Sequence, residues 1–135
     1  MNNTEFYNLF SFNIYFRSAN YVTDNSKNLG APFNFVALML KGMVKLKTRN
    51  QVIEIKEDEV FFIPKNQLYD SHWFVDKNGE IEFLSLGASN LPISSTTHYL
   101  IQKINCTDNQ KEILYKFLDD CTVSCKTVGL FYEFL

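Results

Sequence analysis

The residues that could do chemistry gather in the stretch EVFFIPKNQLYDSHWF, residues 59 to 74. It contains His72, one of two histidines in the chain, the other being His98. Metals such as zinc and iron favour imidazole and carboxylate ligands, so a metal site would need both histidines to converge with a carboxylate such as Glu82. Two histidines are few for this purpose. We therefore expect no metal site.

Tyr69, Ser71 and Trp73 alternate along the same stretch and share one strand face, with the histidine on the other face. Tyrosine and tryptophan combine an apolar ring with one hydrogen-bonding group, which suits a small organic effector. The alternative is that these side chains fill the interior of a small barrel. The same two interpretations apply to Phe33 and Phe35. All five residues are candidates for an effector pocket.

No catalytic arrangement is recognisable in the sequence. Glu57, Asp58 and Glu59 are adjacent on a turn, so they would not face a common substrate, and a solvated turn is the better interpretation. A Ser-His-Asp order, a glycine-rich phosphate loop and a Cys-x-x-C motif are all missing from the sequence. We expect a protein that is not an enzyme, with no catalytic residues and no cofactor.

The three cysteines have no paired spacing, which argues against a disulfide framework and favours reduced thiols in a cytoplasmic protein. Cys121 and Cys125 are four residues apart and would share a helix face if the helix reaches that far. A redox sensor would need an activated thiolate, and only Lys126 stands nearby in the sequence. Buried or unreactive thiols are the preferred interpretation.

Composition narrows the function classes further. The 135 residues suit one domain, and the net charge of −2, with scattered lysines and arginines, offers no basic face for phosphates. This segment is therefore not expected to bind DNA itself. No apolar run reaches membrane-spanning length, and the N-terminus lacks the basic start of a signal peptide.

Short strands are the elements that must position the candidate residues. Alternation and apolar runs predict strands at 12–17, 33–40, 43–48, 52–55, 60–63, 69–75, 80–86 and 98–104, with a turn-rich stretch at 23–32. Lys41-Gly42 and Asn78-Gly79 are typical of hairpin turns, because glycine readily adopts positive φ. About eight closely spaced short strands predict a mainly β protein, a sandwich or a barrel.

The pattern changes after Cys106. Thr107 and Gln110 match a helix capping box. The apolar residues that follow fall on one helical stripe: Ile113, Leu114, Phe117, Leu118 and Cys121. This stripe either packs on the outside of the barrel or meets the same helix of a second protomer. A second stripe runs from Val128 to Leu135, where the sequence stops inside the amphipathic pattern, so we expect the native chain to continue.

Residues 33 to 87 resemble the N-terminal cupin domain of AraC/XylS-type bacterial transcription regulators. The matching stretches are FNFVALMLKGMVKL, IEIKEDEVFFIPKNQLYDSHW and GEIEFLSLG. In that family a strand ends in a glycine turn, here Lys41-Gly42, and a charged turn precedes an apolar strand ending in Ile-Pro. Many members have Gly-Asp at the charged turn, where this chain has Asp58-Glu59. Tyr69 occupies a position that is often histidine.

The resemblance implies a cupin-like antiparallel β-barrel, a double-stranded β-helix, over residues 1–106 and a helical linker and dimerisation segment over 107–135. It implies that a small effector binds in the barrel and that the first helical stripe contributes to a homodimer. DNA would be bound only through a helix-turn-helix domain that this sequence lacks. Two other hypotheses stay open: a stand-alone cupin enzyme, such as an isomerase or dioxygenase, and a carbohydrate-binding or purely structural barrel.

Overall fold

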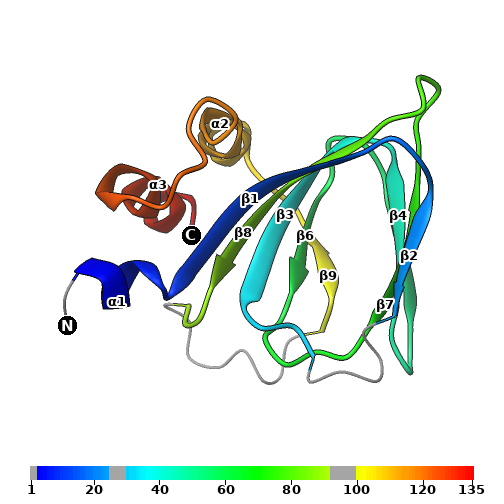
Figure 1. The fold of residues 1–135 in the computed structure, drawn as a ribbon, viewed down its shortest axis with the longest axis horizontal. Helices are drawn as coiled ribbons and strands as arrows, with labels where there is room; N and C mark the ends of the chain where they lie inside the picture. The colour runs from blue at the N-terminus through cyan, green and yellow to red at the C-terminus, as the bar shows by residue number, and fades with distance from the viewer. Residues whose placement is uncertain (1–2, 25–29, 92–99) are drawn as a thin grey trace.

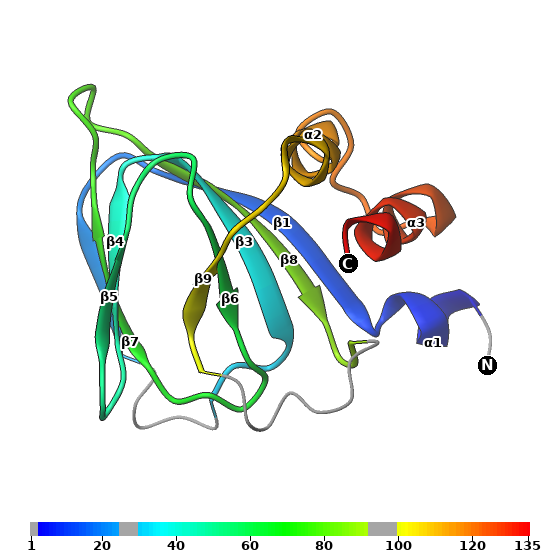
Figure 2. The ribbon, with the colours of Figure 1, turned by 180° about the vertical axis from the view of Figure 1, so that it is seen from behind.

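Two antiparallel β-sheets face each other in the computed structural model, which describes residues 3–24, 30–91 and 100–135 (Figures 1 and 2). The five-stranded sheet has the order β1-β8-β3-β6-β9, and the four-stranded sheet has the order β2-β7-β4-β5. The strands are β1 (Phe10–Arg17), β2 (Tyr21–Asp24), β3 (Asn34–Lys41), β4 (Met43–Lys47), β5 (Val52–Ile55), β6 (Val60–Ile63), β7 (Asp70–Phe74), β8 (Ile81–Ala88) and β9 (Gln102–Ile104). The helices are α1 (Asn3–Tyr7), α2 (Asp108–Lys116) and α3 (Cys125–Phe134). The predicted mainly β fold with C-terminal helices is confirmed, with the barrel built as two separate sheets.

Successive strands mostly alternate between the two sheets, and this corrects both predicted hairpins. Lys41-Gly42 connects β3 of one sheet to β4 of the other, and Asn78-Gly79 connects β7 to β8 in the same way. Glycine is still required there, because φ is +86° at Gly42 and +76° at Gly79. The β4–β5 connection at residues 48–51 is a hairpin between neighbouring strands. Turn residues thus predicted where the chain turns, but not which strands pair.

β3 is apolar on both faces because each face meets a different core. Ala37 and Met39 point between the two sheets and join the inner cluster, which also contains Trp73. Val36 and Leu38 point to the opposite side and join an outer cluster beneath the C-terminal helices. A strand covered on both sides loses the alternation of apolar and polar residues.

The helices α2 and α3 cover the outer face of the five-stranded sheet, over β1 and β8 (Figures 1 and 2). Phe117, after α2, and Phe131, in α3, are fully buried, and their ring centroids lie 5.4 and 5.6 Å from that of Phe12 on β1. No helix in the described part of the chain is long and apolar enough to cross a membrane.

The start of α2 follows the predicted capping box, which is confirmed. The Thr107 side chain accepts from the Gln110 backbone N–H at 3.1 Å, and the Gln110 side chain accepts from the Thr107 backbone N–H at 2.9 Å. Ser124 and Thr127 form the same arrangement at the start of α3. Each box satisfies backbone donors that a helix start leaves unpaired.

The turn between β5 and β6 holds α2 to the sheet through Asp58. Lys111 Nζ lies 2.8 Å from Asp58 Oδ2 and also donates to the Asp58 carbonyl oxygen at 2.9 Å. Asp58 has φ +66°, a conformation that glycine adopts more easily than other residues. Many members of the family that this chain resembles have the glycine of a Gly-Asp turn at the position of Asp58. The positive φ at this position explains their glycine.

Candidate functional site

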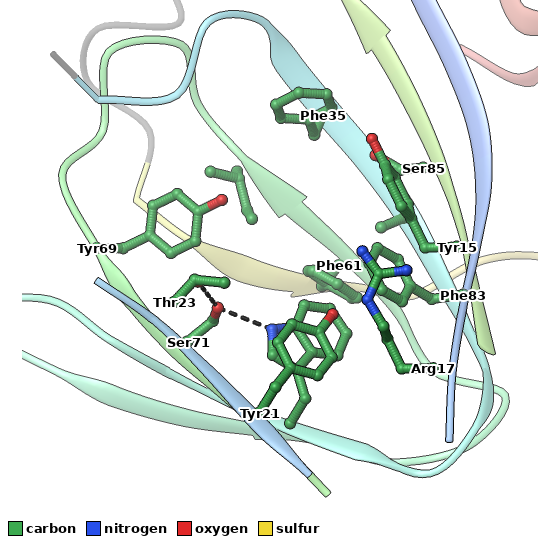
Figure 3. A pocket seen from close by; sticks show the side chains of 13 residues that line it. Tyr15, Arg17, Tyr21, Thr23, Phe35, Phe61, Tyr69, Ser71, Phe83 and Ser85 are labelled. Carbon is green, nitrogen blue, oxygen red and sulfur yellow. Dashed lines mark hydrogen bonds between the residues drawn. The ribbon is translucent and has the colours of Figure 1, made fainter. Parts of the chain in front are cut away.

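A cavity of about 240 Å³ lies between the two sheets (Figure 3). Strands of both sheets contribute to it, and its lining is mainly aromatic with several hydroxyl groups. The lining residues are Tyr15, Arg17, Tyr21, Thr23, Phe35, Ala37, Phe61, Ile63, Tyr69, Ser71, Trp73, Phe83 and Ser85. An apolar concave site with a few polar groups is the usual form of a small-molecule site.

β7 places its candidates as the alternation predicts. Ser71 and Trp73 are buried and line the cavity, and His72 between them is exposed. Tyr69 lies just before the strand and also lines the cavity, as does Phe35 of β3. Phe33 is outside the lining and packs edge-on against Phe35, with 6.0 Å between ring centroids. The structure thus brings together four of the five candidates at one cavity.

Four stacked rings form one wall of the cavity and cross from one sheet to the other. Tyr21 and Trp73, on neighbouring strands β2 and β7, are nearly parallel, with an interplanar angle of 4° and 5.6 Å between centroids. Trp73 stacks on Phe83 at 4.2 Å, and Phe83 stacks on Tyr15 at 4.9 Å. Such a wall presents a broad apolar surface of well-defined shape.

Hydroxyl groups supply the neutral polar part of the lining. The Trp73 indole N–H donates to Ser71 Oγ at 2.8 Å, and Ser71 is hydrogen-bonded in turn to Thr23. Figure 3 shows Thr23 and Ser71 on the side of the cavity where Tyr69 lies. Ser85 on β8 is buried and lines the cavity, and its hydroxyl has no hydrogen bond to another residue in the described part of the chain.

Arg17, at the end of β1, is the one residue with a formal charge at neutral pH among the described residues that line the cavity. Its side chain is exposed, and the centre of its guanidinium group lies 5.6 Å from the centroid of the Tyr21 ring. Nη1 donates to the Phe16 carbonyl oxygen at 2.8 Å. Burial raises the pKa of Tyr21, so this phenol stays neutral beside the arginine. The cavity therefore has an aromatic interior and a positive charge at its rim.

Residues of β1 and β2 are the part of the site that sequence reasoning missed. Tyr15 and Arg17 share a face in the alternation recognised at residues 12–17, so a signal for this pair was present. Tyr21 and Thr23 belong to a four-residue strand that runs into the stretch interpreted as turn. Four residues are too few to show a periodicity, and the pairing with β7 that defines this strand is a tertiary contact.

His72 and Glu82, two of the three residues considered for a metal site, are not among the lining residues of the cavity. His72 points away from it and stacks on Phe74, with 4.2 Å between ring centroids. Glu82 of β8 lies between the inward-facing Ile81 and Phe83, on the opposite face. His98 lies outside the described residues. Within residues 3–24, 30–91 and 100–135, no three His, Cys, Asp or Glu side chains could hold a metal ion together.

The helical stripe divides between interior and surface. Ile113, Leu114 and Phe117 are at most 2% exposed and belong to the outer core cluster, so they pack on this chain's own sheet. These three side chains therefore take the first of the two predicted alternatives, packing on the outside of the barrel. They are not available to a second protomer. Leu118 is 38% exposed, and Cys121 is partly buried.

All three cysteines are free thiols, and two of them are in apolar surroundings. Burial raises the pKa of the Cys106 thiol, and burial together with Asp120 raises the pKa of Cys121 to about 11. A thiol with such a pKa is almost entirely protonated at neutral pH and reacts slowly. Cys125 Sγ lies 3.1 Å from the Tyr7 hydroxyl.

Comparison with known proteins bears on the fold. No protein-family model and no curated protein matches the sequence. Apo ToxT from Vibrio cholerae is 16% identical, with a TM-score of 0.68 over 93% of this chain and 52% of that chain. Wild-type ToxT with an unsaturated fatty acid bound is 16% identical, with a TM-score of 0.66 over 93% of this chain and 50% of that chain. A protein of unknown function from Pseudomonas syringae is 12% identical, with a TM-score of 0.51 over 72% of this chain and 37% of that chain.

This chain spans about half the length of the ToxT chains that it matches. ToxT is a regulator of the AraC family, and the matching part is its N-terminal domain. The match covers 93% of this chain, which has two sheets joined by mostly alternating strand connections and C-terminal helices. The chain has the cupin-like fold of the N-terminal domain of AraC-type transcription regulators.

Proposed function

We propose that this chain is the sensing domain of an AraC-type transcription regulator and binds a small effector between its two sheets. The cavity carries this proposal, because it has an aromatic lining, a few hydroxyl groups and access from solvent in a fold shared with a regulator. ToxT, which has this fold, is known with an unsaturated fatty acid bound. The effector would act through different affinities for two arrangements of the regulator.

β1 offers a physical route from the cavity to the helices. Tyr15 and Arg17 line the cavity from one face of β1. Phe10 and Phe12, on the other face of the same strand, contact the rings of Phe131 and Phe117. A ligand that shifts β1 would therefore shift the surface on which α2 and α3 lie. In the proposed mechanism, those helices lead to a DNA-binding domain that this sequence lacks, and their position sets its geometry on two half-sites.

Homodimer formation is the second part of the proposal. Its interface must use surface other than Ile113, Leu114 and Phe117, because these side chains are buried within the chain. Leu118 is the member of the stripe that keeps the most exposed apolar surface. We place the regulator in the cytoplasm, where its DNA would be.

Trp73 provides the test of effector binding, since it is the single tryptophan of the chain and lines the cavity. A screen of small acids, sugars and aromatic compounds should find a compound that changes the tryptophan emission and raises the melting temperature. Ser85→Leu places three more carbon atoms in the cavity and should abolish both effects. A compound that binds equally well to Ser85→Leu would show that the effector site is elsewhere.

The regulatory part is tested on the protein in its own cells. Antibody capture after crosslinking, with intact-mass measurement, should recover a product longer by a DNA-binding domain of about 100 residues together with specific DNA. A product of this length alone, recovered without DNA, would overturn the proposed control of transcription.

A further inference from the structure

The charge at the rim of the cavity indicates the class of effector. Arg17 carries a full positive charge, and among the described residues it forms no ion pair. A guanidinium group has five N–H donors, and the structure gives one of them a partner, the Phe16 carbonyl oxygen. The remaining donors have no partner among the residues that the structure describes, so they could meet an acceptor that enters from solvent.

The Tyr21 ring fixes where these donors lie. The guanidinium centre stands 5.6 Å from the ring centroid, a distance at which a cation is attracted to an aromatic face. The ring is held in turn by nearly parallel stacking on the buried Trp73. Figure 3 shows the Arg17 side chain on the same side of the cavity as Tyr15, across from Tyr69. The positive charge is thus attached to the aromatic wall and not to a mobile loop.

Among the described lining residues, the interior offers an anion no second positive charge. Every other member of the lining is aromatic, aliphatic or a hydroxyl residue. A carboxylate placed deep among them would lose its hydration without gaining a counter-charge, which is costly. A carboxylate at the rim keeps part of its hydration and gains charge-assisted hydrogen bonds to Arg17. The apolar body of the same molecule would then lie along the stacked rings.

We propose that the effector is a small monocarboxylic acid with an apolar body, whose carboxylate binds Arg17 at the rim of the cavity. This inference rests on the proposed effector site and deepens it. The cavity of about 240 Å³ has the liquid volume of about eight water molecules, so it takes a compact acid and not a drug-sized molecule. Octanoate and 3-phenylpropanoate are suitable probes, and octanamide and 3-phenylpropanamide are their uncharged counterparts.

The decisive experiment titrates the Trp73 fluorescence of wild-type protein and variants with these acids and amides. In the wild type, each acid should bind about tenfold more tightly than its amide, the ratio expected when charge-assisted hydrogen bonds replace neutral ones. Arg17→Gln should weaken acid binding about tenfold and leave amide binding within twofold. Arg17→Lys, which keeps the charge, should retain most of the preference for acids over amides. The acid affinity, but not the amide affinity, should fall as salt is added.

Arg49→Gln is the matched control, since Arg49 is the other arginine of the chain and is exposed on the β4–β5 turn. It should leave both affinities unchanged. Unchanged amide binding by Arg17→Gln also shows that this variant is folded. Equal binding of acids and amides by wild type, or loss of the preference in Arg49→Gln, would overturn the carboxylate inference and leave the effector site standing. Binding of neither acids nor amides would overturn the carboxylate inference, and the effector site itself would fall only if the wider screen of sugars and aromatic compounds also found no ligand.

Discussion

The Tyr115 hydroxyl donates a hydrogen bond of 2.6 Å to Asp58 Oδ1, and so joins α2 to a turn that lies 57 residues earlier in the chain. Lys111, one helical turn before Tyr115, holds the other carboxylate oxygen of Asp58. Two donors on one helix face therefore meet one carboxylate at the end of the five-stranded sheet. In a sensing domain this contact would keep α2 in a fixed position relative to the cavity.

Replacement of Tyr115 by phenylalanine removes this hydrogen bond and keeps the ring. We expect the free energy of unfolding to fall by about 1 kcal/mol, since the bond reaches a charged acceptor but lies at a partly exposed site. The corresponding loss in melting temperature is about 3 °C for a chain of this size. Chemical denaturation followed by far-ultraviolet circular dichroism would measure the change.

The stability difference between wild type and Tyr115→Phe should depend on pH. The hydrogen bond to Asp58 raises the pKa of Tyr115 to about 12, so its contribution is complete below the ordinary value of about 10 and is lost as pH rises through 12. Hydrogen bonds from Lys111 and Tyr115 lower the pKa of Asp58. The stability that its ionised carboxylate contributes is therefore lost as pH falls below about 4. The difference between wild type and Tyr115→Phe should therefore be constant from about pH 5 to 9 and shrink outside that window.

Tyr132→Phe is the control for this prediction. Tyr132 is also an exposed tyrosine on a C-terminal helix, and its described contacts are with the rings of Phe10 and Phe131. Loss of its hydroxyl should change stability by less than about 0.5 kcal/mol at any pH. Equal effects of the two substitutions, or a Tyr115→Phe effect that persists at pH 12, would contradict the assigned role of Asp58.

Phe117 and Leu118 are neighbours in sequence with opposite environments, which makes them a test of how α2 packs. Phe117→Ala removes a fully buried ring from the outer core and should cost about 3–5 kcal/mol of stability. Leu118→Ala should cost less than about 1 kcal/mol, because that side chain is 38% exposed.

Sedimentation of the same two variants separates folding from assembly. A dimer that uses Leu118 would dissociate more easily in Leu118→Ala while the protomer keeps its unfolding free energy. If Phe117→Ala dissociated a dimer and left the protomer as stable as before, the packing of this residue within its own chain would be wrong.

Local pattern predicted which face each residue takes better than it predicted which strands pair. The alternation of Ser71 and Trp73 predicted that they share one face, because side-chain direction in a strand is fixed by the backbone of that strand alone, and the structure shows that this face lines the cavity. The partners of β7 are β2 and β4, which come from distant parts of the sequence, so no local signal specifies them. The stripe in α2 could likewise be recognised, but its burial under Phe12 depends on a tertiary contact.

Gly42 and Gly79 both have positive φ, but their surroundings differ. A Cβ at Gly42 would lie 2.5 Å from the Phe74 carbonyl oxygen, whereas a Cβ at Gly79 would meet nothing within 4 Å. Gly79→Ala should cost about 1–2 kcal/mol, the cost of a left-handed conformation for a residue with a side chain. Gly42→Ala adds a collision with backbone and should cost at least about 2 kcal/mol more.

Thermal denaturation of both variants under identical conditions measures this difference. Comparable melting temperatures for Gly42→Ala and Gly79→Ala would mean that the crossing from β3 to β4 is less tightly packed against Phe74 than the structure has it.

Ser71 is the hydrogen-bond acceptor for the buried indole N–H of Trp73, at 2.8 Å. Ser71→Ala leaves that donor unpaired in a site that is 6% exposed, so we expect a loss of about 1–3 kcal/mol in unfolding free energy. Ser85→Ala is the matched control, because Ser85 is also buried at the cavity but has no side-chain hydrogen bond within the described residues. It should cost less than about 0.5 kcal/mol.

A double-mutant cycle with Trp73→Phe isolates the hydrogen bond from the packing of the ring. Phenylalanine lacks the N–H, so Ser71→Ala should cost at least about 1 kcal/mol less in the Trp73→Phe background than in wild type. Urea denaturation followed by circular dichroism is suitable, because Trp73→Phe removes the only tryptophan. Additive effects would mean that Ser71 serves Thr23 alone, and that the indole is held in the cavity wall by its stacking on Tyr21 and Phe83.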